Sequence, residues 1–131
     1  MMLMQKKIIL IVDDEREITD VLMEFLNTQG YQAVAAHDGP EALGKFHQIK
    51  PDLVLLDLKM PNQNGYDLAM EIKAVSDCEI IIISGYLQQM QGLECAVAAG
   101  VHDFFTKPID LNSLNQRIKM LLSLPKSYSH G

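Results

Sequence analysis

The chain has 131 residues, 48% of them hydrophobic, with 17 Asp and Glu against 11 Lys and Arg and a net charge of −6. This length accommodates one domain with a single core, and the composition excludes disordered and fibrous proteins. The negative charge repels phosphate backbones, so we expect no nucleic-acid binding by this domain. Cys78 and Cys95 lack a CxxC or metal-ligand spacing, which argues against a disulfide framework and favours a cytoplasmic location.

The first residues place two lysines, Lys6 and Lys7, before a short apolar run. That run ends after residue 12, at two acids, and no small-residue cleavage site follows it. No later apolar stretch approaches the roughly 20 residues needed to span a bilayer. We therefore expect neither export by this route nor membrane insertion.

Strand-like and helix-like segments alternate five times along the chain. A continuous apolar run rich in β-branched residues is typical of a strand buried on both faces, and apolar residues spaced by three and four are typical of a helix with one buried stripe. In chain order the sequence predicts strand 8–12, helix 18–30, strand 31–36, helix 39–49, strand 53–56, helix 66–72, strand 80–83, helix 87–99, strand 101–106 and helix 110–122.

Single residues refine three of these helices. The apolar stripe of the first helix includes Ile18 and Val21, and Gly30 can end the helix in a left-handed turn. Gly92 costs the fourth helix about 1 kcal/mol relative to Ala, and Asp110 is the expected N-cap of the last helix. We therefore expect Val21 to face the core and the fourth helix to be loosely held.

Five β-α repeats with short connections predict an α/β fold, a doubly wound five-stranded parallel sheet with helices on both faces. Strands 31–36 and 101–106 are mixed in polarity, whereas the other three are almost wholly apolar, so we assign these two to the edges. This favours the strand order 2-1-3-4-5, in which ligands bind beyond the carboxyl ends of strands one and three. We expect a domain over residues 1–124, followed by a tail or the start of a linker at 125–131.

Three carboxylates follow strands one and three, at the predicted ligand-binding edge. They are Asp13, Asp14 and Asp57. Converging carboxylates repel one another unless they bind a cation or share protons. Oxygen ligands select a hard ion, and Mg²⁺ takes one or two carboxylates while leaving room for phosphate oxygens. The sequence therefore predicts a Mg²⁺ site.

Ser84 and Lys107 end strands four and five at the same edge of the sheet. The Lys ammonium can bind one phosphoryl oxygen, and the Ser hydroxyl can donate to another. Together with a Mg²⁺ ion and an aspartate, these groups suit phosphoryl transfer, whose transition state needs its charge neutralised and its nucleophile aligned.

Four short motifs follow the strands in this order: Asp13-Asp14, Asp57-Leu58-Lys59-Met60-Pro61 with Gly65, Ser84-Gly85, and Lys107-Pro108. In this order and at these strand ends they resemble the receiver domain of two-component response regulators, over residues 6–124. The resemblance implies the flavodoxin-like (βα)5 fold of the chemotaxis receiver.

Carried over position by position, the resemblance implies that Asp57 is the phosphoacceptor. Asp14 and Asp57 would ligate Mg²⁺ directly, Asp13 would act through water, and the backbone carbonyl of Lys59 would be the remaining protein ligand. Lys107 would contact the phosphoryl group, and the Lys107-Pro108 bond would be cis, as X-Pro bonds can be at low cost.

The resemblance also implies how a signal would form and decay. Ser84 would reorient toward the phosphoryl group, and Phe104, three residues before Lys107, would be an aromatic switch. Lys59 and Tyr86 would tune the lifetime of the phosphorylated state. The implied partner is a sensor histidine kinase or a phosphotransfer protein, and the switching face would comprise helix four, strand five and helix five.

Two other function classes are alternatives to the receiver. A haloacid-dehalogenase-type phosphatase would place its nucleophile on the first strand, usually with a second Asp two residues later, whereas Asp13 and Asp14 are adjacent and the chain has no cap domain. A flavodoxin would need a phosphate-cradling loop where Asp13-Asp14-Glu15 repels phosphate. We therefore expect no enzyme beyond a receiver that catalyses its own phosphoryl transfer and autodephosphorylation. The histidines lack ligand spacing, and surface positions are expected for His37, His47, His102 and His130.

Overall fold

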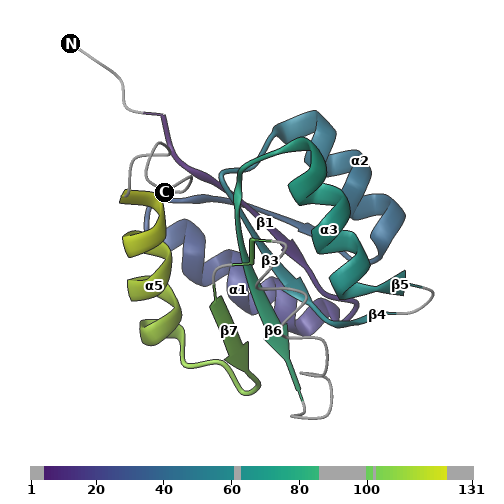
Figure 1. Ribbon diagram of the computed structural model, residues 1–131. Helices are drawn as coiled ribbons and strands as arrows, with labels where there is room; N and C mark the ends of the chain where they lie inside the picture. Colours follow the sequence, from purple (N-terminus) through teal and green to yellow (C-terminus); the bar gives the residue numbers. More distant parts are fainter. Residues whose placement is uncertain (1–4, 61–62, 86–99, 102, 124–131) are drawn as a thin grey trace.

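The computed structural model describes residues 5–60, 63–85, 100–101 and 103–123 (Figure 1). The predicted helix at 87–99, its Gly92, and Tyr86 lie outside these residues, as do His102 and His130. No helix in the described part of the chain is long and apolar enough to cross a membrane.

A five-stranded parallel sheet forms the centre of the molecule. Its strands are, in sheet order, β2 (Gln32–Ala36), β1 (Ile8–Val12), β3 (Leu53–Asp57), β6 (Glu79–Ser84) and β7 (Asp103–Thr106). This is the predicted order 2-1-3-4-5, once two short strands outside this sheet are set aside. The prediction that the second and fifth strands form the edges is also confirmed.

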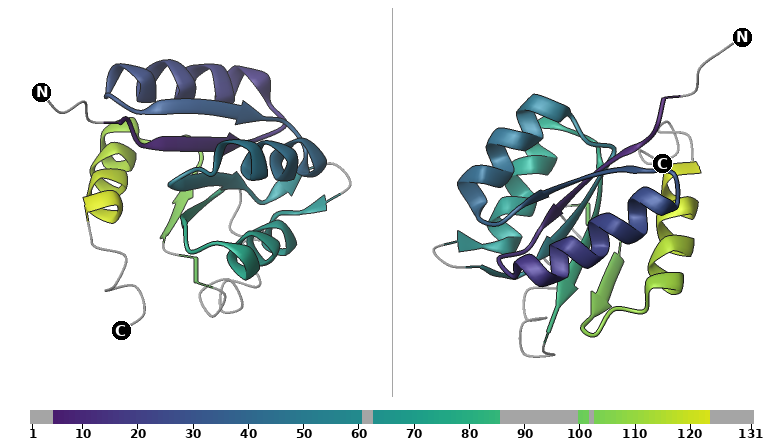
Figure 2. Two further views of the ribbon diagram at one scale, coloured as in Figure 1. Left: turned by 90° about the horizontal axis from the view of Figure 1, so that it is seen from above. Right: turned by 180° about the vertical axis from the view of Figure 1, so that it is seen from behind.

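Helices cover both faces of the sheet (Figures 1 and 2). Helices α1 (Arg16–Thr28) and α5 (Leu111–Ser123) lie on one face, and α2 (Gly39–Ile49) and α3 (Gly65–Val75) lie on the other. Alternate residues of the central strands enter the two layers. Ile9 and Ile11 pack with α1 and α5, while Leu10 and Val12 pack with α2 and α3. The continuous apolar runs predicted as buried strands therefore supply both cores at once.

A short hairpin after β3 was not predicted. Strands β4 (Lys59–Met60) and β5 (Gln63–Asn64) pair antiparallel, between the predicted strand 53–56 and the predicted helix 66–72. Helix α3 begins at Gly65, where an added Cβ would lie 2.7 Å from Leu58 Cα. Only glycine allows this close approach, which brings the start of α3 against the end of β3.

The first helix differs from its predicted stripe. Val21 is 55% exposed, so its placement in the core is wrong, whereas Thr19 is completely buried. The helical period places Thr19 on the same face as the buried Leu22 and Leu26, and hydrogen bonds of its hydroxyl make this burial possible. Gly30 ends the helix with a φ of 96°, as predicted.

Candidate functional site

Acidic residues from two strands meet at the carboxyl edge of the sheet, as the strand order predicts. Asp57 ends β3, Asp13 follows β1, and both are buried, whereas Asp14 is exposed. One carboxylate oxygen from each of the three lies within 4.8 Å of the others. An all-oxygen donor set at this spacing fits a hard divalent cation with water in its remaining positions.

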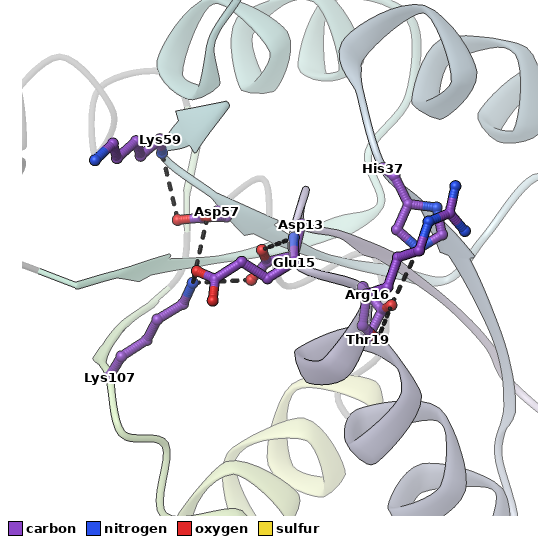
Figure 3. Close-up of polar contacts among 8 residues, drawn as sticks. All are labelled: Asp13, Glu15, Arg16, Thr19, His37, Asp57, Lys59 and Lys107. Carbon is purple, nitrogen blue, oxygen red and sulfur yellow. Dashed lines mark hydrogen bonds and ion pairs between the residues drawn. The ribbon is translucent and has the colours of Figure 1, made fainter. Parts of the chain in front are cut away.

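The Lys107 ammonium lies beside the Asp13 and Asp57 carboxylates (Figure 3). Its Nζ is 2.9 Å from Asp13 Oδ2 and 3.4 Å from Asp57 Oδ2. The backbone positions it, because the Lys107 N–H donates to the Ser84 carbonyl at 2.9 Å. The Lys107-Pro108 bond is cis, as predicted. One ammonium thus partly balances two buried carboxylates.

The electrostatic environment of Asp57 disfavours its charge. Burial and the neighbouring Asp13 carboxylate raise the pKa of Asp57 from 3.8 to about 6, although Lys107 and the Lys59 N–H oppose the change. The Lys59 N–H donates to Asp57 Oδ1 at 3.3 Å. Burial also disfavours the Lys107 ammonium, but its hydrogen bond to Asp13 and the charges of the surrounding acids raise the pKa of Lys107 overall. At neutral pH the carboxylate and the ammonium are therefore both ionised.

An open cleft of about 630 Å³ leads from solvent to these groups. The charged residues that line it are Asp14, Glu15, Asp57, Lys59 and Lys107. Ser84 is completely buried at the end of β6, opposite Thr106 in the register with β7. Phe104 is half-buried and packs against the α2 and α3 layer. The cleft is large enough for a hydrated cation and a phosphoryl-sized group.

Glu15 is a residue of the site that sequence reasoning did not select. Its Oε1 lies 3.4 Å from Lys107 Nζ, across 92 positions of sequence, and its N–H donates to Asp13 Oδ1 at 2.9 Å. A third consecutive acid after the first strand was the available signal, but nothing in the sequence indicated that its side chain contacts Lys107.

A second group of polar residues holds the first turn of α1 (Figure 3). The buried Thr19 hydroxyl donates to the Arg16 carbonyl at 3.0 Å and lies 3.1 Å from His37 Nε2. The latter distance is that of a hydrogen bond, whose direction depends on the tautomer of His37. His37 is half-buried, and its Nδ1 lies 3.5 Å from Glu41 Oε1, whereas His47 is exposed as expected.

Comparison with known proteins identifies the class to which this fold and site belong. The chain matches the response regulator receiver domain family over residues 9–119. This match covers most of the chain, and the chain belongs to that family. The resemblance of its four motifs and the predicted fold are therefore confirmed.

Particular relatives include regulators and solved receivers. The chain is 40% identical to the probable transcriptional regulator ycf27 of Guillardia theta, over 89% of this chain and 46% of that protein. It is 34% identical to the sensory transduction protein RegX3 of Mycolicibacterium smegmatis, over 87% of this chain and 50% of that protein. The chain thus spans about half the length of these curated relatives.

Two solved structures show the same fold. A CheY-like receiver domain protein from Methanospirillum hungatei superimposes with a TM-score of 0.83 at 30% identity, covering 91% of this chain and 95% of that one. TrrA from Thermotoga maritima, solved with Mg²⁺ and beryllofluoride, gives a TM-score of 0.78 at 36% identity, covering 88% and 98%. This chain is therefore a receiver domain of a two-component response regulator by both sequence and fold.

Proposed function

We propose that this chain is a phosphorylation-activated signalling receiver whose Asp57 accepts a phosphoryl group from a sensor histidine kinase or a phosphotransfer protein. The observation that carries the proposal is the position of Asp57. Its carboxylate is buried at a strand end, borders an open cleft, and lies 3.4 Å from Lys107 and within 4.8 Å of two further carboxylates.

The chemistry follows from the state of these groups. Because the pKa of Asp57 is about 6, its carboxylate is ionised at neutral pH and is more basic than an ordinary aspartate. In the transfer, one carboxylate oxygen bonds to phosphorus while the N–P bond of a phosphohistidine breaks, and the imidazole nitrogen keeps the electron pair. Lys107 is placed to bind a phosphoryl oxygen as charge develops on it.

The acidic cluster fits a Mg²⁺ ion in this reaction. Asp14 and Asp57 would ligate it directly, Asp13 through water, and the Lys59 carbonyl would complete the protein ligands. Bound there, Mg²⁺ supplies positive charge to the phosphoryl oxygens. The chain's own contribution is to hold these carboxylates together at the ends of the paired strands β1 and β3.

The signal would pass from the site toward β7. Ser84 would turn toward the phosphoryl group, and Phe104 would move further into the layer that it already contacts, changing the face made by the fourth helix, β7 and α5. Lys59 and Tyr86 would tune the lifetime of the acyl phosphate. Complete burial of an exposed Phe side chain is worth roughly 1.5–3 kcal/mol. Because Phe104 is already half-buried, its further burial would supply part of this, against the few kcal/mol that separate two populated conformers.

The proposed receiver comprises residues 1–124, with 125–131 as a tail or linker start. It catalyses only its own phosphoryl transfer and autodephosphorylation. Since the net charge is −6, we infer that this domain does not itself bind nucleic acid. The relatives named as transcriptional regulators are about twice as long, so we infer that the output lies in another domain or a partner.

Intact-mass spectrometry tests the proposal. Incubation with a small phosphodonor and Mg²⁺ should add one phosphoryl group to the wild type and none to Asp57→Asn. Asp20→Asn, which removes an exposed acid from α1, should be modified like the wild type. Lys107→Ala should still accept phosphate but should show weaker shift changes in NMR spectra. Equal uptake by Asp57→Asn would refute the assignment.

A further inference from the structure

Glu15 contacts the Lys107 ammonium from a different environment than the two buried acids. The Glu15 side chain is 61% exposed, whereas those of Asp13 and Asp57 are 3% and 4% exposed. Glu15 also lines the cleft that leads to Asp57. A phosphodonor that enters this cleft therefore comes close to the Glu15 carboxylate.

The backbone fixes Glu15 in this place. Its N–H donates to Asp13 Oδ1, and its carbonyl accepts from the N–H groups of Ile18 and Thr19 at 3.1 and 3.2 Å. Glu15 is the N-cap residue of α1, yet its side chain makes no capping hydrogen bond. The carboxylate is instead turned toward Lys107, where it occupies one of three ammonium donors.

We propose that Glu15 is a specificity-determining residue that disfavours small, highly charged phosphodonors arriving from solvent. The inference rests on the proposed function of Asp57. A carboxylate at the mouth of the cleft repels a dianionic donor such as acetyl phosphate more than a monoanionic donor such as phosphoramidate. A protein phosphodonor can bring its own positive charge to this rim, so the barrier acts mainly on free metabolite-sized anions.

The dependence of the rate change on the charge of the donor distinguishes electrostatic repulsion by Glu15 from a general loosening of the site. A general loosening of the site that did not act through charge would change the rate with every phosphodonor by the same factor. Repulsion scales with the charge of the donor, so the electrostatic factor for a dianion should be about the square of that for a monoanion. For an exposed charge a few ångströms away these factors are roughly tenfold and threefold.

The test compares Glu15→Gln with Glu17→Gln, which removes the same charge from an exposed position in the first turn of α1. Phosphorylation rates of Asp57 are measured with acetyl phosphate and with phosphoramidate at low and high ionic strength. Glu15→Gln should raise the acetyl phosphate rate roughly tenfold and the phosphoramidate rate roughly threefold at low salt. The difference between donors should shrink at about 1 M salt, where the screening length falls to about 3 Å.

A binding measurement accompanies the rates. The concentration of beryllofluoride that half-saturates the NMR shifts of the site should fall in Glu15→Gln by roughly threefold, as expected for a monoanion, and should be unchanged in Glu17→Gln. Equal acceleration of both donors, or a difference that high salt does not reduce, would overturn the inference. A wild type that no donor modifies would instead overturn the proposed function.

Discussion

The N-termini of α1 and α2 begin with the same kind of residue and use it in opposite ways. At α2, the Asp38 side chain accepts a hydrogen bond from the Glu41 N–H at 2.8 Å and caps the helix. At α1, the Glu15 side chain caps nothing and contacts Lys107. Because a side-chain cap stabilises a helix by about 1 kcal/mol, α1 forgoes that stability where it borders the site.

The other described helices follow α2. Asn64 accepts from the Tyr66 N–H at the start of α3, and Asp110 accepts from Asn112 and Ser113 at the start of α5. The predicted N-cap Asp110 is thus confirmed. Away from the acidic cleft, each of these helices thus begins with a side chain that accepts a hydrogen bond from the backbone. Beside the cleft, the Glu15 side chain contacts Lys107 instead of capping α1. The raised pKa of Asp57 indicates a larger loss of stability at the same site, because the folded protein holds this carboxylate where its charge is disfavoured.

Removing the charge of Asp57 gives the largest expected change in stability. Because the folded protein raises this pKa from 3.8 to about 6, the carboxylate disfavours folding at neutral pH. Without Mg²⁺, Asp57→Asn should raise the free energy of unfolding by up to about 3 kcal/mol in chemical denaturation. Asp38→Asn, which keeps a capping oxygen at α2, should change it by less than about 0.5 kcal/mol.

The pH dependence has a defined sign. The folded protein binds the Asp57 proton more tightly than the unfolded chain, so this stabilisation is complete below about pH 4 and is lost as the pH rises to about 6. The difference in stability between Asp57→Asn and the wild type should therefore grow across this window. If the difference in unfolding free energy between the two proteins stays constant with pH, the Asp57 carboxylate is not the source of the destabilisation.

Magnesium binding should offset the repulsion among the carboxylates of Asp13, Asp14 and Asp57. At a hundredfold excess over its dissociation constant, a ligand of the folded state adds about 2.7 kcal/mol to the free energy of unfolding. Asp14→Ala should lose most of this increase in thermal unfolding experiments, whereas Asp110→Asn, at a helix start away from the cleft, should retain it. A melting temperature that Mg²⁺ leaves unchanged at neutral pH would exclude the metal site.

The polar support of α1 gives a smaller effect. Thr19→Val keeps the shape of the side chain but removes its hydrogen bonds with His37 and with the Arg16 carbonyl, so it should cost about 1.5 kcal/mol. Thr28 offers a matched control in the same helix, since its exposed hydroxyl donates only to the Phe25 carbonyl. Equal losses in Thr19→Val and Thr28→Val would show that the contact with His37 contributes nothing.

The helix starts themselves give the smallest effects. Asp38→Ala should destabilise the protein by about 1 kcal/mol because it removes a cap. Glu15→Gln should change stability by less than about 0.5 kcal/mol, since an exposed ion pair contributes little. A loss for Glu15→Gln as large as that for Asp38→Ala would break the contrast between the two helices.

The sequence predicted the sheet and most of the site for a simple physical reason. Buried parallel strands are continuous apolar runs, and their carboxyl ends meet at one edge, so Asp13, Asp57, Ser84 and Lys107 could be placed together without coordinates. The β4 and β5 hairpin was not predicted, because strands of two residues carry no periodic signal.

Contacts between residues far apart in the sequence account for the remaining differences between the predicted and the observed structure. Burial of Thr19 depends on His37, 18 residues away, and no local pattern indicates that a hydroxyl will replace Val21 at the buried face. The contact of Glu15 with Lys107 spans 92 residues and needs the assembled site. Periodicity reports which face of an element is apolar, but it does not report which polar groups find partners across the fold.

The most direct test of the charge crowding at the cleft is a titration of the Asp57 carboxyl carbon by heteronuclear NMR. Without Mg²⁺ its midpoint should lie near pH 6, and saturating Mg²⁺ should move it downward because the cation binds the ionised form. A midpoint near the ordinary value of 3.8 in the Mg²⁺-free protein would contradict the account.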